Sequence, residues 1–537
     1  MSELKFKLGI KLAGAGLVLA VLGACAGVGQ GPETPRFRDV TESAELDHVY
    51  GGAPEFVVGG GLAALDCNGD TLPEVLLAGG AHPARLFLNR SEAGGAIAFE
   101  AAPDALGLDD GAARKVTGAY PLDVDSDGVL DLFLLRFGRN LLLRGLGDCR
   151  FEEVSVDFGL PAHADWSTAF AAHWEPGAPL PTLAVGNYVN RDRPLDKTGN
   201  CDPSYVLRPR SGAQGYGAPQ PLTPTACTLS ALFLDWRGDG RPDLRLANDR
   251  QYFDPGLSEQ LFRLEAGGPR ALGPEDGWQG PVIWGMGLAA ADLDGDGRPE
   301  VAVTNMADNH LQVLRDPAGG RPDYVNRALE LGTMAQRPHT GGDPRPSTSW
   351  HADFADFNND GHDDLWIVKG NVDAMPEFAN FDPDSLLLGG PKGPFIEAGG
   401  PAGIALDRRG RGGLAADLNG DGWLDLIAVN RDQPVTVLQN VSPGVARFFT
   451  VELRQSETNR FAIGARVETR IAGRSAGRTR VVGGGHAGGA CLPLHYGLGA
   501  ADHAEVRVIW PDGSRSDWRR AGAGETLLFE NRAANRT

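Results

Sequence analysis

A recurring acidic loop constrains this chain more than any other feature of its sequence. In each copy an apolar stretch rich in Gly and Ala leads into the loop, and a second apolar stretch follows it. Most neighbouring copies start 57 to 64 residues apart, and one interval is about twice as long. This period, with several short strands per unit, is typical of a β-propeller or another repeat array. The six loops read DCNGDTLPE, DVDSDGVLD, DWRGDGRPD, DLDGDGRPE, DFNNDGHDD and DLNGDGWLD, and begin at Asp66, Asp123, Asp235, Asp292, Asp356 and Asp417.

The long interval contains a further unit that has lost its acids. The segment WSTAFAAHWEPGAPLPTLAVGN, from Trp166, aligns without a gap with WGMGLAAADLDGDGRPEVAVTN, from Trp284. Trp174 stands where the intact copy has Asp292, whereas the apolar stretches on both sides remain. The chain therefore contains seven units, six with an acidic loop and one without.

The units offer up to four short strands each. In different units, strands are expected at 85–89, 132–135 and 149–154. The seventh unit stops after 434–440, whereas a strand at 37–41 precedes the first unit. We expect this N-terminal strand to complete the seventh unit, because joining the two ends in one sheet would remove a free edge. The sequence thus predicts an all-β fold built on a seven-bladed β-propeller with a small C-terminal β domain.

The acidic loops have the composition of calcium sites. Calcium takes six to eight oxygen ligands, and a short loop can supply them from alternate positions. Here the acids or amides stand at loop positions 1, 3, 5 and 9, and most loops have Gly at position 6 for the sharp turn. Strands flank the loops and the last acid is at position 9, so they are not EF-hands. About five Ca²⁺ sites are expected, with the ligands Asp66, Asn68, Asp70, Glu74; Asp123, Asp125, Asp127, Asp131; Asp292, Asp294, Asp296, Glu300; Asp356, Asn358, Asp360, Asp364; and Asp417, Asn419, Asp421, Asp425.

A simpler interpretation of one such loop is a hairpin turn, since Asp, Asn and Gly favour turns. Five loops in register favour calcium, because their clustered acids would repel one another without a cation. The loop of the fourth unit differs, since Arg237 occupies position 3. We expect its guanidinium to bridge Asp235, Asp239 and Asp243 and to replace the ion.

The N-terminus predicts export. Three lysines precede an apolar run over 12–22, and Leu22-Gly23-Ala24-Cys25 resembles the lipobox of bacterial lipoproteins. Residues 1–24 are expected to be a signal peptide, Cys25 the lipidated first residue, and 25–36 a linker; a plain signal peptide or a membrane anchor is the alternative. Ala26 replaces the aspartate that favours inner-membrane retention, so the outer membrane or cell surface is the expected location.

Five cysteines remain in the mature chain. Cys201 and Cys227 bracket a stretch containing Pro, Gly and Ser, and a disulfide between them is expected in an oxidising compartment. The sequence gives no pairing for Cys67, Cys149 and Cys491.

The propeller is expected over 37–445 and a small β domain over 446–537, where polar and apolar residues alternate. This second region has 14 Arg, no Lys and nine acids, a net charge of +5. Its charge favours docking on the acidic propeller or capture of an acidic ligand, although a solvated strand face explains the arginines as well. A G-x-S-x-G sequence at 473–477 joins two alternating strands, so it is expected to be a hairpin tip and not a hydrolase elbow. Strands are expected at 449–453, 465–471, 478–482 and 505–510, with turns at 473–477 and 511–514.

The loops and units resemble the FG-GAP or VCBS repeats of integrin α-type propellers. The segments NRFAIGAR from Asn459, HYGLG from His495 and VRVIWPDG from Val506 resemble the UnbV-type domain. Together they resemble the bacterial branch of the cartilage acidic protein family, over roughly residues 37–531. The resemblance implies extracellular calcium binding and interaction. The chain departs from it in the lost third loop, in Arg237, and at 484–490, where the family has a Gly-Tyr-Leu-Ser-like segment.

The function predicted is that of an exported calcium-binding propeller lipoprotein, a binding, adhesion or scaffold module in which calcium is structural. A protein or glycan partner outside the cytoplasm is expected, and a net charge of −20 argues against nucleic acid. No catalytic set is apparent, so an enzyme is not expected; the alternative is an extracellular carbohydrate-active or hydrolytic enzyme using the central mouth of the propeller. Four asparagines recur thirteen places after loop position 1, as turn residues or as a ligand face: Asn187, Asn248, Asn305 and Asn430.

Overall fold

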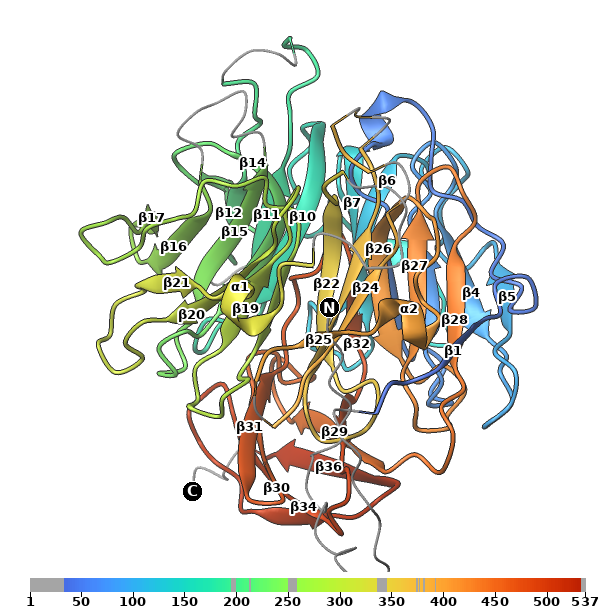
Figure 1. Cartoon of the computed structure of the whole chain (residues 1–537). Coiled ribbons are helices and arrows are strands. Elements are labelled where there is room, and N and C mark those ends of the chain that lie inside the picture. The colour runs from blue at the N-terminus through green and yellow to red at the C-terminus, as the bar shows by residue number, and fades with distance from the viewer. Residues whose placement is uncertain are drawn as a thin grey trace, which may run out of the picture.

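The computed structural model describes residues 33–532, apart from 195–198, 212–213, 250–257, 336–344, 373–374, 376, 380–381 and 392. Its fold is an all-β propeller followed by a smaller β domain, and Figure 1 shows this domain, in red, against one end of the propeller. The helical segments are short: η1 (Pro54–Phe56), α1 (Ala328–Leu331) and α2 (Gly399–Ala402). No helix in the described ranges is long and apolar enough to cross a membrane. The expected signal peptide and Cys25 lie outside the described residues.

Among the described residues, the propeller strands fall into seven groups of four antiparallel strands, and each group contains one of the seven sequence units. In six groups the strands follow one another along the chain, and β10 also pairs with the end of β7, which joins the second and third groups. The six groups are β2–β5 (Leu62–Leu65, Glu74–Leu77, Arg85–Asn89, Phe99–Ala102), β6–β9 (Val116–Leu122, Asp131–Gly138, Leu141–Gly145, Phe151–Glu153), β10–β13 (Asp165–His173, Thr182–Asn187, Tyr205–Leu207, Gln220–Pro221), β14–β17 (Cys227–Leu234, Asp243–Asp249, Gln260–Glu265, Gly268–Ala271), β18–β21 (Leu288–Ala291, Glu300–Val303, His310–Leu314, Tyr324–Asn326) and β22–β25 (Ser349–Ala355, Asp364–Lys369, Ser385–Leu388, Ile396–Glu397).

The seventh group brings together the two ends of the propeller sequence. It consists of β26 (Gly410–Ala416), β27 (Asp425–Asn430), β28 (Thr436–Asn440) and β1 (Phe37–Asp39). β1 pairs with β28 in antiparallel orientation, with Phe37 opposite Asn440. The predicted pairing of the N-terminal strand with the seventh unit is therefore confirmed.

Small residues in the inner strands allow close approach at the axis. A Cβ atom at Gly61 would lie 1.8 Å from the carbonyl oxygen of Ala487, and one at Gly412 would lie 2.5 Å from that of Gly60. Larger apolar side chains fill the space between neighbouring groups, as where Trp366 packs in the core shared by the sixth and seventh. The Gly and Ala in the first stretch of each unit thus follow from the convergence of the inner strands.

The C-terminal domain has two sheets around its own apolar core. One sheet has the order β33 (Leu494–Gly497), β29 (Phe448–Gln455), β36 (Glu525–Asn531). The other has the order β31 (Arg474–Thr479), β30 (Arg466–Ile471), β34 (Ala504–Ile509), β35 (Arg519–Ala521).

The hairpin between β30 and β31 differs from the predicted one. Ile471 pairs with Arg474, so the turn consists only of Ala472 and Gly473, which both have positive φ (49° and 81°). A two-residue turn of this kind matches the twist of the strands that it joins. The expected turn at 473–477 and strand at 478–482 are therefore wrong, because the strand starts at Arg474. The G-x-S-x-G sequence lies in a hairpin, as predicted, but only Gly473 is in the turn and the other four residues belong to β31.

Residues 480–492, termed here the central segment, leave the C-terminal domain and enter the middle of the propeller. Within it, β32 (Gly489–Cys491) pairs in parallel with β2, as a fifth strand of the first group. Backbone bridges join Val482, Gly485 and Gly488 to inner strands of the third, fifth and second groups. The central segment thus pairs with four of the seven groups from the inside, and its amides at Gly484 and His486 donate to Ala231 of the fourth group and His351 of the sixth.

Candidate functional site

The acidic loops join the first and second strands of their groups, so they share one end of the propeller, termed here the loop end. Numbered by group, and with the corresponding loop of the unit without acids as loop three, they are loop one (66–74), loop two (123–131), loop three (174–182), loop four (235–243), loop five (292–300), loop six (356–364) and loop seven (417–425). In each of the five predicted calcium loops, the acid at position 9 is the first residue of the second strand. Strand pairing therefore holds this carboxylate beneath the loop.

Hydrogen bonds to the backbone fix the carboxylates in each loop. In loop six, Asp356 accepts from the amides of Asp360 (3.0 Å) and Gly361 (2.7 Å). The position-9 acid, Asp364, accepts from the amides of Phe357 (3.0 Å) and Gly389 (2.8 Å). Both carboxylates are buried, so each loop gathers negative charge in a protected space.

Burial and the neighbouring carboxylates raise the pKa of acids in these loops. Burial raises the pKa of Asp131 in loop two to about 8, and the nearby carboxylates of Asp125 and Asp123 act in the same direction. Burial likewise raises the pKa of Glu300 in loop five to about 8, with further contributions from the neighbouring aspartates. A divalent cation would compensate the charges that these shifts reflect.

Loop five has the donor set that best fits a cation. Carboxylate oxygens of Asp292, Asp294 and Glu300 lie within 4.8 Å of one another, as do those of three acids in loop two. Asp292 is 2% exposed, and its Oδ1 has no hydrogen-bond partner among the described residues. An all-oxygen set with a buried, unpartnered carboxylate oxygen suits a hard cation such as Ca²⁺.

Loop four contains its own cation, as the sequence predicts. The guanidinium of Arg237 binds Asp243 at 2.5 Å and Asp239 at 3.0 Å. Arg263 adds a further contact to Asp243, at 3.2 Å. The expected contact of Arg237 with Asp235 is not found within the described residues, because Asp235 accepts the backbone amides of Asp239 and Gly240 instead.

The C-terminal domain docks on the loop end, one of the alternatives that its charge suggested. Arg466 binds Asp292 in loop five at 2.5 Å, and Arg478 pairs with Asp363 in loop six. The amide of Asn459 donates to Ser126 Oγ in loop two at 2.9 Å. Sequence reasoning did not identify these residues, because nothing in an alternating strand marks which arginines meet the other domain.

The central segment fills the axis with neutral contacts. The amide of Gly59 donates to Nε2 of His486 (3.2 Å), so Nδ1 carries the proton and donates to the carbonyl of Met286 (3.1 Å). The amide of His486 donates to Nδ1 of His351 at 3.2 Å. Burial lowers the pKa of His486 to about 4 and that of His351 to about 3, so both rings stay neutral near pH 7.

Aromatic and cation–π contacts continue this column away from the loops. Trp350 lies against His486, with ring centroids 4.9 Å apart, and the guanidinium of Arg411 lies 4.2 Å from the centre of the Trp350 ring. Trp350 and Arg411 are almost completely buried. This part of the axis is therefore packed with side chains.

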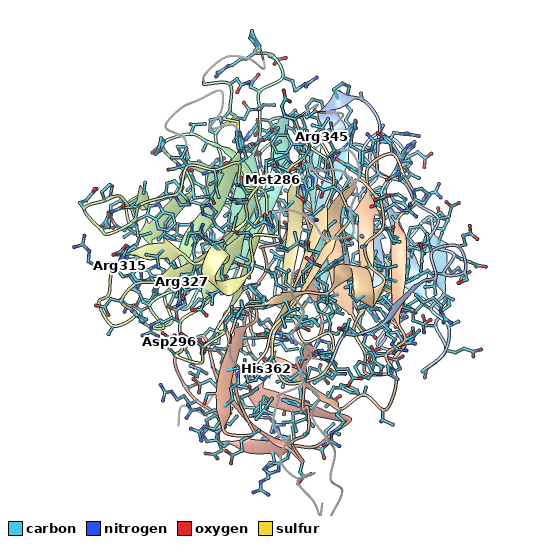
Figure 2. All side chains as sticks on the ribbon, viewed as in Figure 1. Met286, Asp296, Arg315, Arg327, Arg345 and His362 are labelled. Carbon is cyan, nitrogen blue, oxygen red and sulfur yellow. A yellow bond between two sulfur atoms is a disulfide. The ribbon has the colours of Figure 1, made fainter. Side chains whose placement is uncertain are left out.

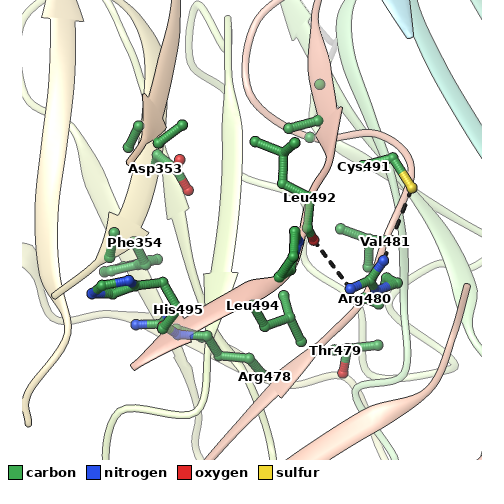
Figure 3. A pocket seen from close by; sticks show the side chains of 18 of the residues that line it. Asp353, Phe354, Arg478, Thr479, Arg480, Val481, Cys491, Leu492, Leu494 and His495 are labelled. Carbon is green, nitrogen blue, oxygen red and sulfur yellow. Dashed lines mark hydrogen bonds between the residues drawn. The ribbon is translucent and has the colours of Figure 1, made fainter. Parts of the chain in front are cut away.

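A cavity of about 520 Å³ lies between the central segment, the inner strands and the C-terminal domain. Figure 3 shows Asp353 of β22 on one side of this cavity and Leu492, Leu494 and Arg480 on the other. Arg480 donates to the carbonyl of Leu492 at 3.1 Å. Burial raises the pKa of Asp353 to about 7. The cavity thus lies at the boundary of the two domains.

The four recurrent asparagines are buried at the other end of the propeller. Each donates from its side-chain amide to a backbone carbonyl of its own group, at 2.8 Å in every case. The acceptors are Pro203, Ser258, Asp308 and Pro434, for Asn187, Asn248, Asn305 and Asn430 respectively. This geometry is that of the turn role and leaves little side-chain surface for a ligand.

Two disulfides link the described cysteines. Cys201 and Cys227 are joined, as expected, and Cys67 is joined to Cys149, which connects the first and second groups. The second pair could not be predicted from the sequence, because its members lie 82 residues apart in different units. Cys491 is free and buried, near Arg480. Figure 2 shows the side chains over the whole molecule, with Asp296 of loop five and His362 of loop six labelled near the C-terminal domain.

Two sequence families match parts of the chain. The FG-GAP repeat matches residues 284–320, which contain loop five, and the ASPIC and UnbV family matches residues 455–536. A comparison with curated proteins found no match.

Known structures of similar fold include propellers and enzymes of low sequence identity. The Dos1 propeller is 10% identical, with 75% of this chain and 97% of that chain covered and a TM-score of 0.34. An ancestral GH74 enzyme is 11% identical (89% and 63% covered, TM-score 0.40), and the exotype rhamnogalacturonan lyase YesX is 12% identical (90% and 92% covered, TM-score 0.32). The chain thus carries an FG-GAP repeat in an all-β propeller and ends in an ASPIC and UnbV domain.

Proposed function

We propose that this chain is an exported, calcium-loaded propeller that acts as a binding, adhesion or scaffold module. Calcium is structural in this proposal, and about five loops hold it. The observation that carries it is loop five, where three carboxylates converge and the buried Oδ1 of Asp292 has no partner among the described residues. Loops one, two, six and seven offer ligands at the same positions.

The propeller is proposed to be a closed ring of seven blades, one for each four-stranded group. The pairing of β1 with β28 supports closure, because it completes the last group with the first strand of the chain. Membership of the cartilage acidic protein family is part of the same proposal, on the strength of the loops and the C-terminal segments quoted above.

Calcium in these loops would stabilise the fold and would not be the contact point for a partner molecule. The C-terminal domain contacts loops two, five and six directly, so a large partner has little access to ions held there. What calcium supplies is charge compensation for buried carboxylates.

The alternative function, a carbohydrate-active or hydrolytic enzyme, needs an open central mouth. The domain-boundary cavity with Asp353 is the feature that favours it. Against it, the C-terminal domain covers the loop end, and Arg411, Trp350 and His486 fill the axis beyond the cavity. A binding role on the outer surface of the propeller requires no such opening, so we do not propose an enzyme.

The chain is further proposed to be anchored by a lipid on Cys25, at the outer membrane or cell surface, with a protein or glycan partner outside the cytoplasm and no role with nucleic acid. Mass spectrometry of the mature protein should find a lipidated N-terminal Cys25. A Cys25→Ala variant should be released from the membrane fraction; if it remains there, the anchor is contradicted.

The central test is the metal content of the mature chain, made soluble by Cys25→Ala. After dialysis against micromolar calcium at neutral pH, elemental analysis should find about five calcium ions per chain. A chain that holds no calcium under these conditions would contradict the proposed function.

A further inference from the structure

The C-terminal domain contacts loop five through one backbone bridge and one arginine side chain. Asp292 forms an isolated backbone bridge with Gly477 of β31. Arg466 of β30 donates to Oδ2 of Asp292 at 2.5 Å and to the carbonyl of Gly297 at 2.9 Å. The first residue of the loop is therefore fixed by a domain more than 170 residues further along the chain.

Loop six is held in the same way. Arg474 donates to the carbonyl of Gly361, and Arg478 pairs with Asp363. The side chain of Asn359 accepts from Nε2 of His495 at 2.8 Å, and its carbonyl accepts from the amide of Gly499 at 2.8 Å. Most of these contacts reach backbone groups or non-ligand residues, so they depend on the shape of the loop.

Docking uses one carboxylate oxygen of Asp292 and leaves the other available. Oδ2 accepts from Arg466 and from the amide of Gly297, whereas Oδ1 is buried and has no hydrogen-bond partner in the described part of the chain. Loop five carries four carboxylates, and two negative charges remain after one Ca²⁺ binds. Arg466 therefore still faces a negative loop, and the ion and the docked domain can be present together.

The shape of the loops in turn depends on charge compensation. Without a cation, the crowded carboxylates of these loops repel one another, which favours an open loop and would withdraw the carbonyl groups that Arg466 and Arg474 bind. Loops five and six are thus two points at which metal loading would reach the second domain.

We propose that calcium in loops five and six latches the C-terminal domain onto the propeller and so keeps the central segment in the axis. This inference rests on the calcium loading proposed above. Loss of calcium would loosen the domain, withdraw the central segment and open the domain-boundary cavity to solvent. The latch would make access to the axis depend on the calcium concentration outside the cell.

Hydrogen exchange of residues 480–492 tests the latch in the mature Cys25→Ala chain. Chelation of calcium is expected to raise exchange of this segment by about tenfold or more, because contacts worth about 1–2 kcal/mol are lost. If calcium is bound and then removed but exchange of the segment does not change, the latch is overturned while the calcium proposal survives. If the chain binds no calcium at all, both fail.

A matched pair of variants separates loop five from general destabilisation. Asp296 and Asp239 both stand at position 5 of exposed loops, but loop four is bridged by Arg237. In calcium, Asp296→Asn should lose one ion and raise exchange of 480–492 several-fold, whereas Asp239→Asn should do neither. Loss of the ion from Asp296→Asn with unchanged exchange would overturn the latch.

A second pair tests the contact itself. Arg466→Gln should keep the metal content and raise exchange of 480–492 in calcium. Arg470→Gln is the control, since Arg470 lies on the same strand, half exposed, and contacts Glu505 of its own domain. If Arg466→Gln exchanges no faster than Arg470→Gln, Arg466 does not transmit the effect.

Discussion

Loops four and five have nearly the same sequence, DWRGDGRPD and DLDGDGRPE, yet they compensate their acids differently. In loop four the cation is Arg237, which stands at a ligand position and bridges Asp239 and Asp243. In loop five an arginine also binds, but Arg466 comes from the other domain and leaves Oδ1 of Asp292 without a partner among the described residues. The difference shows that similar acidic loops can receive positive charge from within the loop or from the second domain, and that only the first arrangement brings an arginine to a ligand position.

Removal of calcium should have the largest effect on thermal stability. It should affect loop five, which is proposed to hold an ion, and not loop four. Each ion that binds only the folded chain contributes about 3 kcal/mol when calcium is near 100 times its Kd, so chelation should lower the Tm by roughly 10 °C or more. Differential scanning calorimetry with and without chelator measures this shift. An unchanged Tm would remove the distinction between the two loops.

The substitution Arg237→Asp should give loop four the same pattern of acidic residues as loop five. It restores an acid at position 3, so the variant should bind one calcium more than the parent. Without calcium it should lose about 3 kcal/mol of unfolding free energy, because buried Asp243 loses its closest cation. Elemental analysis and urea unfolding provide the two readouts. Arg241→Asp, at position 7 of the same loop, is the control and should gain no ion.

Asp296→Asn and Asp239→Asn should differ in thermal stability by a smaller amount. In calcium, the first loses a ligand of loop five and should lower the unfolding free energy by about 2–3 kcal/mol. The second removes only an exposed ion pair, worth less than about 1 kcal/mol. Equal losses in urea unfolding would contradict the assignment of an ion to loop five and not to loop four.

The smallest expected effect is the response of loop four to acid. Although burial acts in the opposite direction, the hydrogen bond from Arg237 lowers the pKa of Asp239. A carboxyl whose pKa is lower in the folded chain stabilises it above the unfolded pKa of about 4, and this contribution is lost as pH falls through the folded value. Comparison of urea unfolding at pH 5 and pH 3 should show a slightly smaller acid loss for Asp239→Asn than for the parent. No difference would mean that this ion pair is without effect.

Much of the fold could be predicted, because each repeat unit in the sequence corresponds to one group of strands. In six units the acid at loop position 9 marks the first residue of the group's second strand. The alignment of Trp166 with Trp284 identifies the unit without acids. The partner of the strand at 37–41 follows from the need to complete a sheet.

Contacts that join distant parts of the chain could not be predicted from the sequence. It did not place the central segment, since a glycine-rich stretch at 484–490 carries no periodic pattern. Nor could it pair Cys67 with Cys149 or distinguish Arg466, which docks, from Arg470, which does not, because both lie on one alternating strand. The hairpin turn was placed too late because Arg474 to Gly477 have weak strand preferences, and the pairing of β31 with β30 overrides them.

The strand Phe37–Asp39 also sets the order in which the molecule can be assembled. Its partner, Thr436–Asn440, is among the last parts of the propeller to emerge during synthesis. Until then Phe37–Asp39 has no sheet to join, and the last group lacks its outer strand. Synthesis from the N-terminus therefore delivers the beginning of the fold long before its final β-sheet can form, and the unpaired strand stays exposed to aggregation during that interval.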